Sequence, residues 1–168
     1  MRFGIKTIDD FDINNKTILC RVDMNQPVDK ATNTLKSIAR IQAVVPTLKE
    51  LSEKGAKVVL MAHQGSDIEY KNFYTTEPHA KVLSELLGKE VMFIPDVCGP
   101  AAIEKIKSLQ AGDILLLDNV RFMSEEQTLF ELKLCLTHEQ MAQTVLVQKL
   151  APLADLYLND AFAASHRD

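Results

Sequence analysis

Four apolar runs in this chain are each followed by polar side chains of the kinds that bind anions. These residues are Arg21, Asp23 and Asn25; His63 and Gln64; Asp118, Asn119 and Arg121; and Asn159, Asp160, His166 and Arg167. Guanidinium groups donate several hydrogen bonds in a planar fork, which suits phosphate and carboxylate ligands. If the four runs end at the same place in the fold, these residues form one cationic site for a small anion.

The apolar runs themselves have the composition of buried strands. Five such segments lie near residues 17–22, 57–62, 91–94, 114–118 and 155–159. They are continuously apolar rather than alternating, which is typical of a parallel sheet covered on both faces. Segments with helical periodicity lie between them, at residues 36–54, 77–87, 100–109 and 137–150. The alternation predicts a Rossmann-like α/β fold of three layers (α/β/α) with a mainly parallel sheet.

This fold class gives the strand ends their importance. In open α/β sheets, ligands bind at the carboxyl ends of the strands, where loops complete the site. Two long loops are expected at residues 26–34 and 66–76. Gly88 is a plausible end for the second helix, and Thr137 with Gln140 forms a capping-box pattern at the start of the fourth.

Length and composition agree with a single globular domain over residues 1–168. The chain is 46% apolar and 25% charged, which is ordinary for a globular protein. Its net charge of −4 argues against a nucleic-acid partner. No apolar run reaches the roughly 20 residues that a membrane span needs. Three unpatterned cysteines and the lack of a signal-peptide pattern favour a reduced, cytoplasmic setting.

Motifs for several common chemistries do not occur in the sequence. Neither the G-x-G-x-x-G nor the G-x-x-x-x-G-K-[ST] pattern of nucleotide-phosphate loops is found. No cysteine or histidine cluster has metal-ligand spacing. A hydrolytic dyad such as Asp23 with His63 lacks a clear nucleophile, since Ser66 and Ser165 are candidates only by proximity. We therefore expect no metal and no cofactor on this chain.

The candidate residues also have structural interpretations. Arg21 could end its strand at the surface and pair with Asp23. Arg121 lies between apolar residues after a leucine-rich strand, so its charge needs a carboxylate or a ligand phosphate, and ligand binding is the better explanation. His63 is equally consistent with a core histidine that bonds to backbone. The remaining histidines are predicted on helix surfaces and are assigned no role: His79 and His138.

Five motifs in order resemble those of the N-terminal domain of phosphoglycerate kinase, along essentially the full chain. They are Arg21-Val-Asp-Met-Asn-Gln-Pro27, similar to R-V-D-F-N-x-P; Arg40-Ile-Gln-Ala-Val-Val-Pro-Thr47, similar to R-I-x-A-x-x-P-T; Gly55-Ala-Lys-Val-Val-Leu-Met-Ala-His63, similar to G-A-K-V-V-L-x-S-H; Asp118-Asn-Val-Arg-Phe122, similar to E-N-x-R-F; and Asn159-Asp-Ala-Phe through His166-Arg167, similar to N-D-A-F-x-x-x-H-R. Gln64 directly after His63 resembles the archaeal branch of the family.

The resemblance implies a set of functional residues. Arg40 would be the catalytic arginine, which neutralises the transferring phosphoryl group. Asp23 and Asn25 would contact the hydroxy-acid part of 3-phosphoglycerate. Arg121 and Arg167 would hold its phosphate. The substrate-binding set implied is Arg21, Asp23, Met24, Asn25, His63, Gln64, Gly65, Ser66, Arg121, His166 and Arg167.

The resemblance also implies an activity for a longer protein. The complete enzyme would transfer phosphate between Mg-ATP and 3-phosphoglycerate in glycolysis and gluconeogenesis, as a cytoplasmic monomer or homodimer. A C-terminal nucleotide-binding domain would hold Mg-ATP or Mg-ADP. That domain is absent from these 168 residues, so the chain is expected to be the N-terminal half of a two-domain kinase and inactive alone.

One departure from the family pattern leaves other functions open. The family has an arginine soon after the histidine, as in H-x-x-R-P, whereas this chain has Ser66 and Asp67 there. One alternative is therefore a diverged kinase-like paralogue for another carboxylate substrate. A second is a non-catalytic acid-binding or interaction module.

Overall fold

The computed structural model describes residues 4–29, 31–32, 34–65, 73–126 and 136–162. Three predicted site residues lie outside these ranges: Ser66, His166 and Arg167. The same holds for Asp67 and for most of the second expected loop. The cationic site can therefore be followed through the loops after the first, second and fourth predicted strands.

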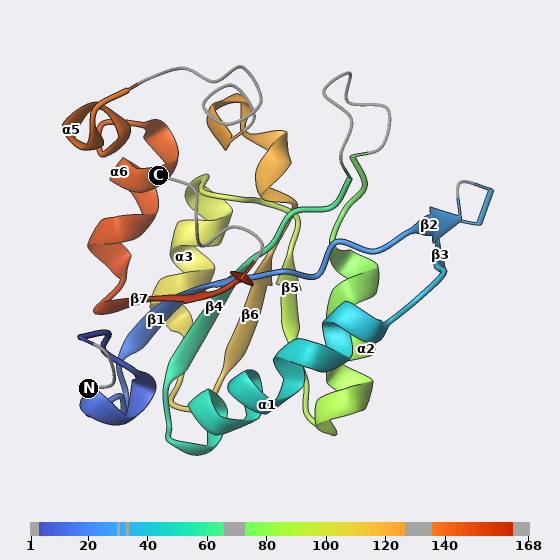
Figure 1. Ribbon diagram of the computed structural model, residues 1–168, viewed down its shortest axis with the longest axis horizontal. Helices are drawn as coiled ribbons and strands as arrows, with labels where there is room; N and C mark the ends of the chain where they lie inside the picture. The colour runs from blue at the N-terminus through green and yellow to red at the C-terminus, as the bar shows by residue number, and fades with distance from the viewer. Residues whose placement is uncertain (1–3, 30, 33, 66–72, 127–135, 163–168) are drawn as a thin grey trace.

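Five parallel strands form the central sheet, in the order β5-β6-β4-β1-β7 (Figure 1). Their bounds are β1 Thr17–Val22, β4 Lys57–Met61, β5 Met92–Ile94, β6 Ile114–Leu117 and β7 Leu156–Asp160. Each neighbouring pair runs parallel. All five predicted strands and their parallel arrangement are confirmed, with small differences at the ends.

Helices cover both faces of the sheet (Figure 1). Their bounds are α1 Ala39–Glu53, α2 Glu77–Leu87, α3 Pro100–Ser108, α5 His138–Met141 and α6 Val145–Leu150. Leu60 and Leu116 belong to the core beneath α1 and α2, whereas Val59 and Leu115 belong to the core beneath α3 and α6. Successive strand side chains point to opposite faces, so continuously apolar strands produce two cores. The three-layer Rossmann-like architecture is confirmed.

The predicted helix over residues 137–150 is two helices rather than one. The capping box at its start is present, but α5 ends after about one turn. The carboxylate of Glu125 accepts hydrogen bonds from the amides of Val145 and Leu146 at 2.7 and 2.9 Å. Exposed amides at a helix start need such partners, so a contact from another segment favours a new helix at this point. The sequence pattern within residues 137–150 does not indicate this break between two helices.

The expected loop over residues 26–34 contains a short antiparallel hairpin, β2 Val28–Asp29 with β3 Thr34–Leu35. The described part of the chain also contains three 3-10 turns: η1 Ile8–Asp10, η2 Val120–Phe122 and η3 Ala151–Leu153. Among the described residues, no helix has both the length and the apolar character to cross a membrane.

Candidate functional site

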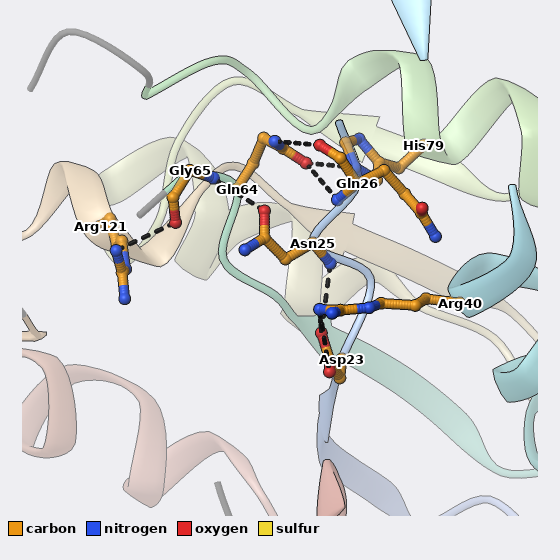
Figure 2. A network of polar contacts seen from close by, with 8 residues as sticks. All are labelled: Asp23, Asn25, Gln26, Arg40, Gln64, Gly65, His79 and Arg121. Carbon is orange, nitrogen blue, oxygen red and sulfur yellow. Dashed lines mark hydrogen bonds and ion pairs between the residues drawn. The ribbon is translucent and has the colours of Figure 1, made fainter. Parts of the chain in front are cut away.

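The loops after β1, β4 and β6 lie side by side, because these three strands are neighbours in the sheet. The β1 loop carries Asp23 and Asn25, the β4 loop carries Gly65, and the β6 loop carries Arg121. Figure 2 shows these residues converging from separate segments. The end of β7 lies beside them, since Asn159 and Asp160 pair with Arg21 and Val22 of β1. The structure thus brings together all four strand ends that the sequence marks as an anion site.

Gly65 links the three loops. Its amide donates to Asn25 Oδ1 at 3.0 Å, and its carbonyl oxygen accepts from Arg121 Nη1 at 2.9 Å. The backbone φ of Gly65 is +97°, a left-handed conformation that suits glycine because it has no Cβ. A side chain at this position would strain the turn and disturb both hydrogen bonds.

Arg121 is buried, with 6% of its surface exposed. Its guanidinium bonds to the Gly65 carbonyl and lies 5.9 Å from the centre of the Phe73 ring, a cation–π distance. Its backbone amide donates to Asn119 Oδ1 at 3.1 Å. These contacts hold a positive charge where it is sheltered from water, so its attraction for an anion is stronger than at the surface.

Asp23 and Arg40 form an ion pair beside this cluster. Arg40 lies in the first turn of α1, and its Nη1 is 3.2 and 3.3 Å from the two carboxylate oxygens of Asp23. The arginine side chain is 55% exposed. The Asp23 side chain is 23% exposed, and an ion pair with one exposed partner is expected to contribute little to stability.

Arg21 has a different partner from the one that its structural interpretation predicts. Asp23 pairs with Arg40, whereas Arg21 Nη2 bonds to Glu126, which lies 105 residues away in the chain. Both side chains of this second pair are mostly buried. The predicted pair of Arg21 with Asp23 is therefore wrong, and its true partner comes from a segment that no local pattern relates to β1.

Besides Gly65 and Arg121, two further residues of the predicted substrate-binding set are buried. Met24 has no exposed surface and belongs to the core beneath α1 and α2. Its side chain packs among apolar residues, and its contact with a ligand stays a prediction. Gln64 is 3% exposed, and both polar atoms of its side chain bond to the backbone of Gln26.

The sequence predicts His79 on a helix surface, and this prediction is wrong. The residue is 1% exposed, and its Nε2 lies 3.0 Å from Gln64 Oε1. Burial lowers the pKa of His79 to about 4, although nearby backbone carbonyls oppose the change. His79 stands four residues before Leu83, a core residue of α2, and this spacing places both on one helix face. This spacing is the sequence signal that indicates a buried position for His79.

Asn119 and Asp118 join the β6 loop to its neighbours. The Asn119 side chain accepts from the Gln64 amide at 3.1 Å and donates to the carbonyl oxygens of Gln64 and Tyr74 at 2.8 and 3.0 Å. Asp118 Oδ1 accepts from the Thr76 amide at 2.9 Å. Both residues are buried, and their hydrogen bonds hold in place the backbone segment that carries Arg121.

A cavity of about 300 Å³ opens beside the cluster. It is lined by Asn25, Gln26, Pro27, Val28, Arg40, Gln64, Gly65 and Tyr74. His63 is half-buried at the end of β4. A larger hollow of about 500 Å³ beside α3 is lined by Asp118 but by no residue of the predicted substrate-binding set. Across the described ranges, no three histidine, cysteine, aspartate or glutamate residues are grouped to hold a metal ion.

A Rossmann-like sheet with arginines and amide donors at its strand ends defines an α/β domain suited to a small anion. A family model described as phosphoglycerate kinase matches residues 8–168. The chain therefore belongs to the phosphoglycerate kinase family, as its five motifs predict.

The relatives with the most similar sequences include archaeal phosphoglycerate kinases. The chain is 47% identical over 167 residues to that of Methanobacterium bryantii, covering 99% of this chain and 39% of the relative. It is 46% identical to that of Sulfurisphaera tokodaii, covering 98% and 38%. The crystal structure of the Pyrococcus horikoshii enzyme superposes with a TM-score of 0.86 at 42% identity, covering 97% and 38%. The chain thus spans about two fifths of the length of these relatives.

Proposed function

We propose that this chain is the 3-phosphoglycerate-binding part of a phosphoglycerate kinase. In the complete enzyme, phosphate would pass between ATP and the carboxylate of 3-phosphoglycerate, a step of glycolysis and gluconeogenesis. Family membership and the similarity to archaeal phosphoglycerate kinases over nearly the whole chain support this activity.

The observation that carries the proposal is the joining of three strand-end loops by Asn25, Gly65 and Arg121. The arrangement offers a sheltered guanidinium and side-chain amide groups beside a cavity of about 300 Å³. Such a site suits a small organic anion whose phosphate bonds to arginine and whose remaining oxygens bond to amide groups.

Several of the described site residues have proposed roles in this reaction. Asp23 and Asn25 contact the hydroxy-acid part of the substrate, which places its carboxylate for transfer. Arg121 binds the phosphate, with His63 nearby. Arg40 neutralises the charge of the phosphoryl group during transfer. Its side chain is exposed and pairs with Asp23, so it would be free to turn toward the phosphoryl group. Outside the described residues, Arg167 is proposed as a second phosphate ligand.

Phosphoryl transfer requires little covalent chemistry from the protein. Its rate depends on the position of the reactants and on neutralisation of the charge on the transferring group. This chain would supply the acceptor site and the exposed Arg40. Mg-ATP would be held by a nucleotide-binding domain beyond these 168 residues, so this chain alone is not expected to transfer phosphate. Closure of the two domains would then exclude water from the reaction.

Calorimetric titration of the 168-residue chain tests this function. 3-Phosphoglycerate should bind more tightly than either glycerate or inorganic phosphate alone, because each part of the ligand meets its own group of residues. Mg-ATP should give no heat of binding. Tight binding of Mg-ATP without binding of 3-phosphoglycerate would contradict the proposal.

A second candidate function follows from one sequence observation. Ser66 and Asp67 stand where the family has an arginine, so a diverged enzyme for another carboxylate substrate is the alternative. A calorimetric screen of small phosphorylated acids separates the two functions, because a diverged site would prefer another acid over 3-phosphoglycerate.

A further inference from the structure

The side chain of Gln64 behaves as an additional peptide group between two loops. Its Oε1 accepts from the backbone amide of Gln26 at 3.0 Å, and its Nε2 donates to the Gln26 carbonyl oxygen at 2.7 Å. The regular pairing of β1 with β4 ends at Arg21 and Met61. Gln64 therefore connects the two chains again beyond the ends of the strands.

His79 holds the other side of the same carboxamide (Figure 2). A backbone amide can only donate, so its bond to Gln64 identifies the acceptor as Oε1. That oxygen can accept a second bond, and His79 Nε2 lies 3.0 Å from it. His79 Nε2 must then carry the proton. Gln26, Gln64 and His79 are 4%, 3% and 1% exposed, so no bulk water can replace these bonds.

The residues next to this bonded group are those of the proposed site. Asn25 directly precedes Gln26, and Gly65 directly follows Gln64. Gly65 in turn bonds to Asn25 through its amide and to Arg121 through its carbonyl. Displacement of Gln64 would therefore move Gly65 and disturb the contacts of both ligand-binding side chains.

We propose that Gln64 is a positioning residue of the site. It holds Asn25 and Gly65 in the geometry that binds the ligand, and His79 holds Gln64. The choice of 3-phosphoglycerate as the ligand for testing this role rests on the function proposed above. The proposal replaces a direct substrate contact for the Gln64 side chain, because its amide group bonds to protein atoms on both sides.

The test is a double-mutant cycle in 3-phosphoglycerate affinity. Gln64→Leu keeps the size of the side chain but removes its hydrogen bonds, and Kd should rise about tenfold, equivalent to about 1.4 kcal/mol. Asn25→Ala should also weaken binding. If Gln64 acts through Asn25, the double variant should bind little worse than the weaker single variant. Gln143→Leu, on an exposed segment, is the matched control and should bind normally.

Two further measurements keep the test decisive. His79→Phe leaves both bonds between Gln64 and Gln26 in place, so it should fold even if Gln64→Leu does not, and Kd should rise by a smaller factor of about three. Amide hydrogen exchange at Gly65 needs no ligand. It should be faster in either variant than in the wild type, and unchanged in Gln143→Leu.

The outcomes separate the two proposals. If the wild type binds 3-phosphoglycerate and the folded variants bind equally well, or if the losses from Gln64→Leu and Asn25→Ala simply add, the positioning role is wrong. Unchanged exchange at Gly65 would also overturn it. If the wild type itself does not bind, the proposed function fails, and the exchange measurement still decides the role of Gln64.

Discussion

Replacing His79 with glutamine should remove much of the acid sensitivity of this fold above pH 5. Burial lowers the pKa of His79 from 6.5 to about 4. The unfolded chain therefore takes up a proton on this residue below pH 6.5, whereas the folded chain does so only near pH 4. Acid favours the unfolded chain, so stability falls as the pH drops through this interval.

The size of the effect follows from the two pKa values. The difference between 6.5 and about 4, at about 1.36 kcal/mol per pH unit, limits the loss to about 3 kcal/mol. Roughly 2 kcal/mol of this loss should occur between pH 7.5 and 5.0. Asp96 and Asp155 have pKa values below 3.8 in the fold, so stability linked to them is lost at lower pH.

Urea denaturation followed by circular dichroism measures this directly. The free energy of unfolding is determined at pH 7.5, 6.5 and 5.0 for the wild type and for His79→Gln. The comparison uses the change with pH, because the substitution also alters a hydrogen bond to Gln64. His138→Gln, on the exposed surface of α5, is the matched control. Equal pH dependence in the wild type and His79→Gln would show that the folded chain protonates His79 easily, and the reasoning would be refuted.

Three predictions concern the ligand. Arg121→Ala should weaken 3-phosphoglycerate binding by roughly 1.5–3 kcal/mol, the range for hydrogen bonds to charged groups. The control Lys81→Ala, on the exposed face of α2, should leave the affinity unchanged. Unchanged affinity in a folded Arg121→Ala variant would make this arginine purely structural. In the complete enzyme, Arg40→Ala should lower kcat far more than it raises KM, because its charge matters most during transfer; steady-state kinetics that show only a KM effect would rule out that role. Ser66→Arg should lower the Kd for 3-phosphoglycerate about fivefold, the effect of about 1 kcal/mol, in parallel calorimetric titrations at fixed ionic strength; a flat or weaker response would favour the diverged paralogue.

The strands and most helices could be predicted because their signals are local. A continuous apolar run such as 114–117 has no exposed face, and this alone indicates a strand buried on both sides. Gly88 ends α2 with a left-handed φ of +62°, as a glycine at a helix end predicts. These signals lie inside the helix or strand that they define, or directly beside its end. The packing of the rest of the fold therefore does not change what they predict.

The partners of the site residues could not be predicted in the same way. The structural interpretation of Arg21 pairs it with Asp23, but in the folded chain Asp23 pairs with Arg40 and Arg21 pairs with Glu126. Each pairing depends on where a helix or a distant loop packs against the sheet. Several carboxylates were available to each arginine along the chain, and only the packed arrangement selects one.

The sequence by itself determined the alternating α/β fold, the family and the placing of polar residues after strands, because these depend on residue type and short spacing. Tertiary structure alone decided that β1, β4 and β6 are neighbours, that Gly65 bonds to both Asn25 and Arg121, and that His79 lies buried against Gln64. Strand order and helix docking set those contacts, since they bring together groups far apart in the chain. A hydrogen bond forms only where the fold places donor and acceptor within about 3 Å.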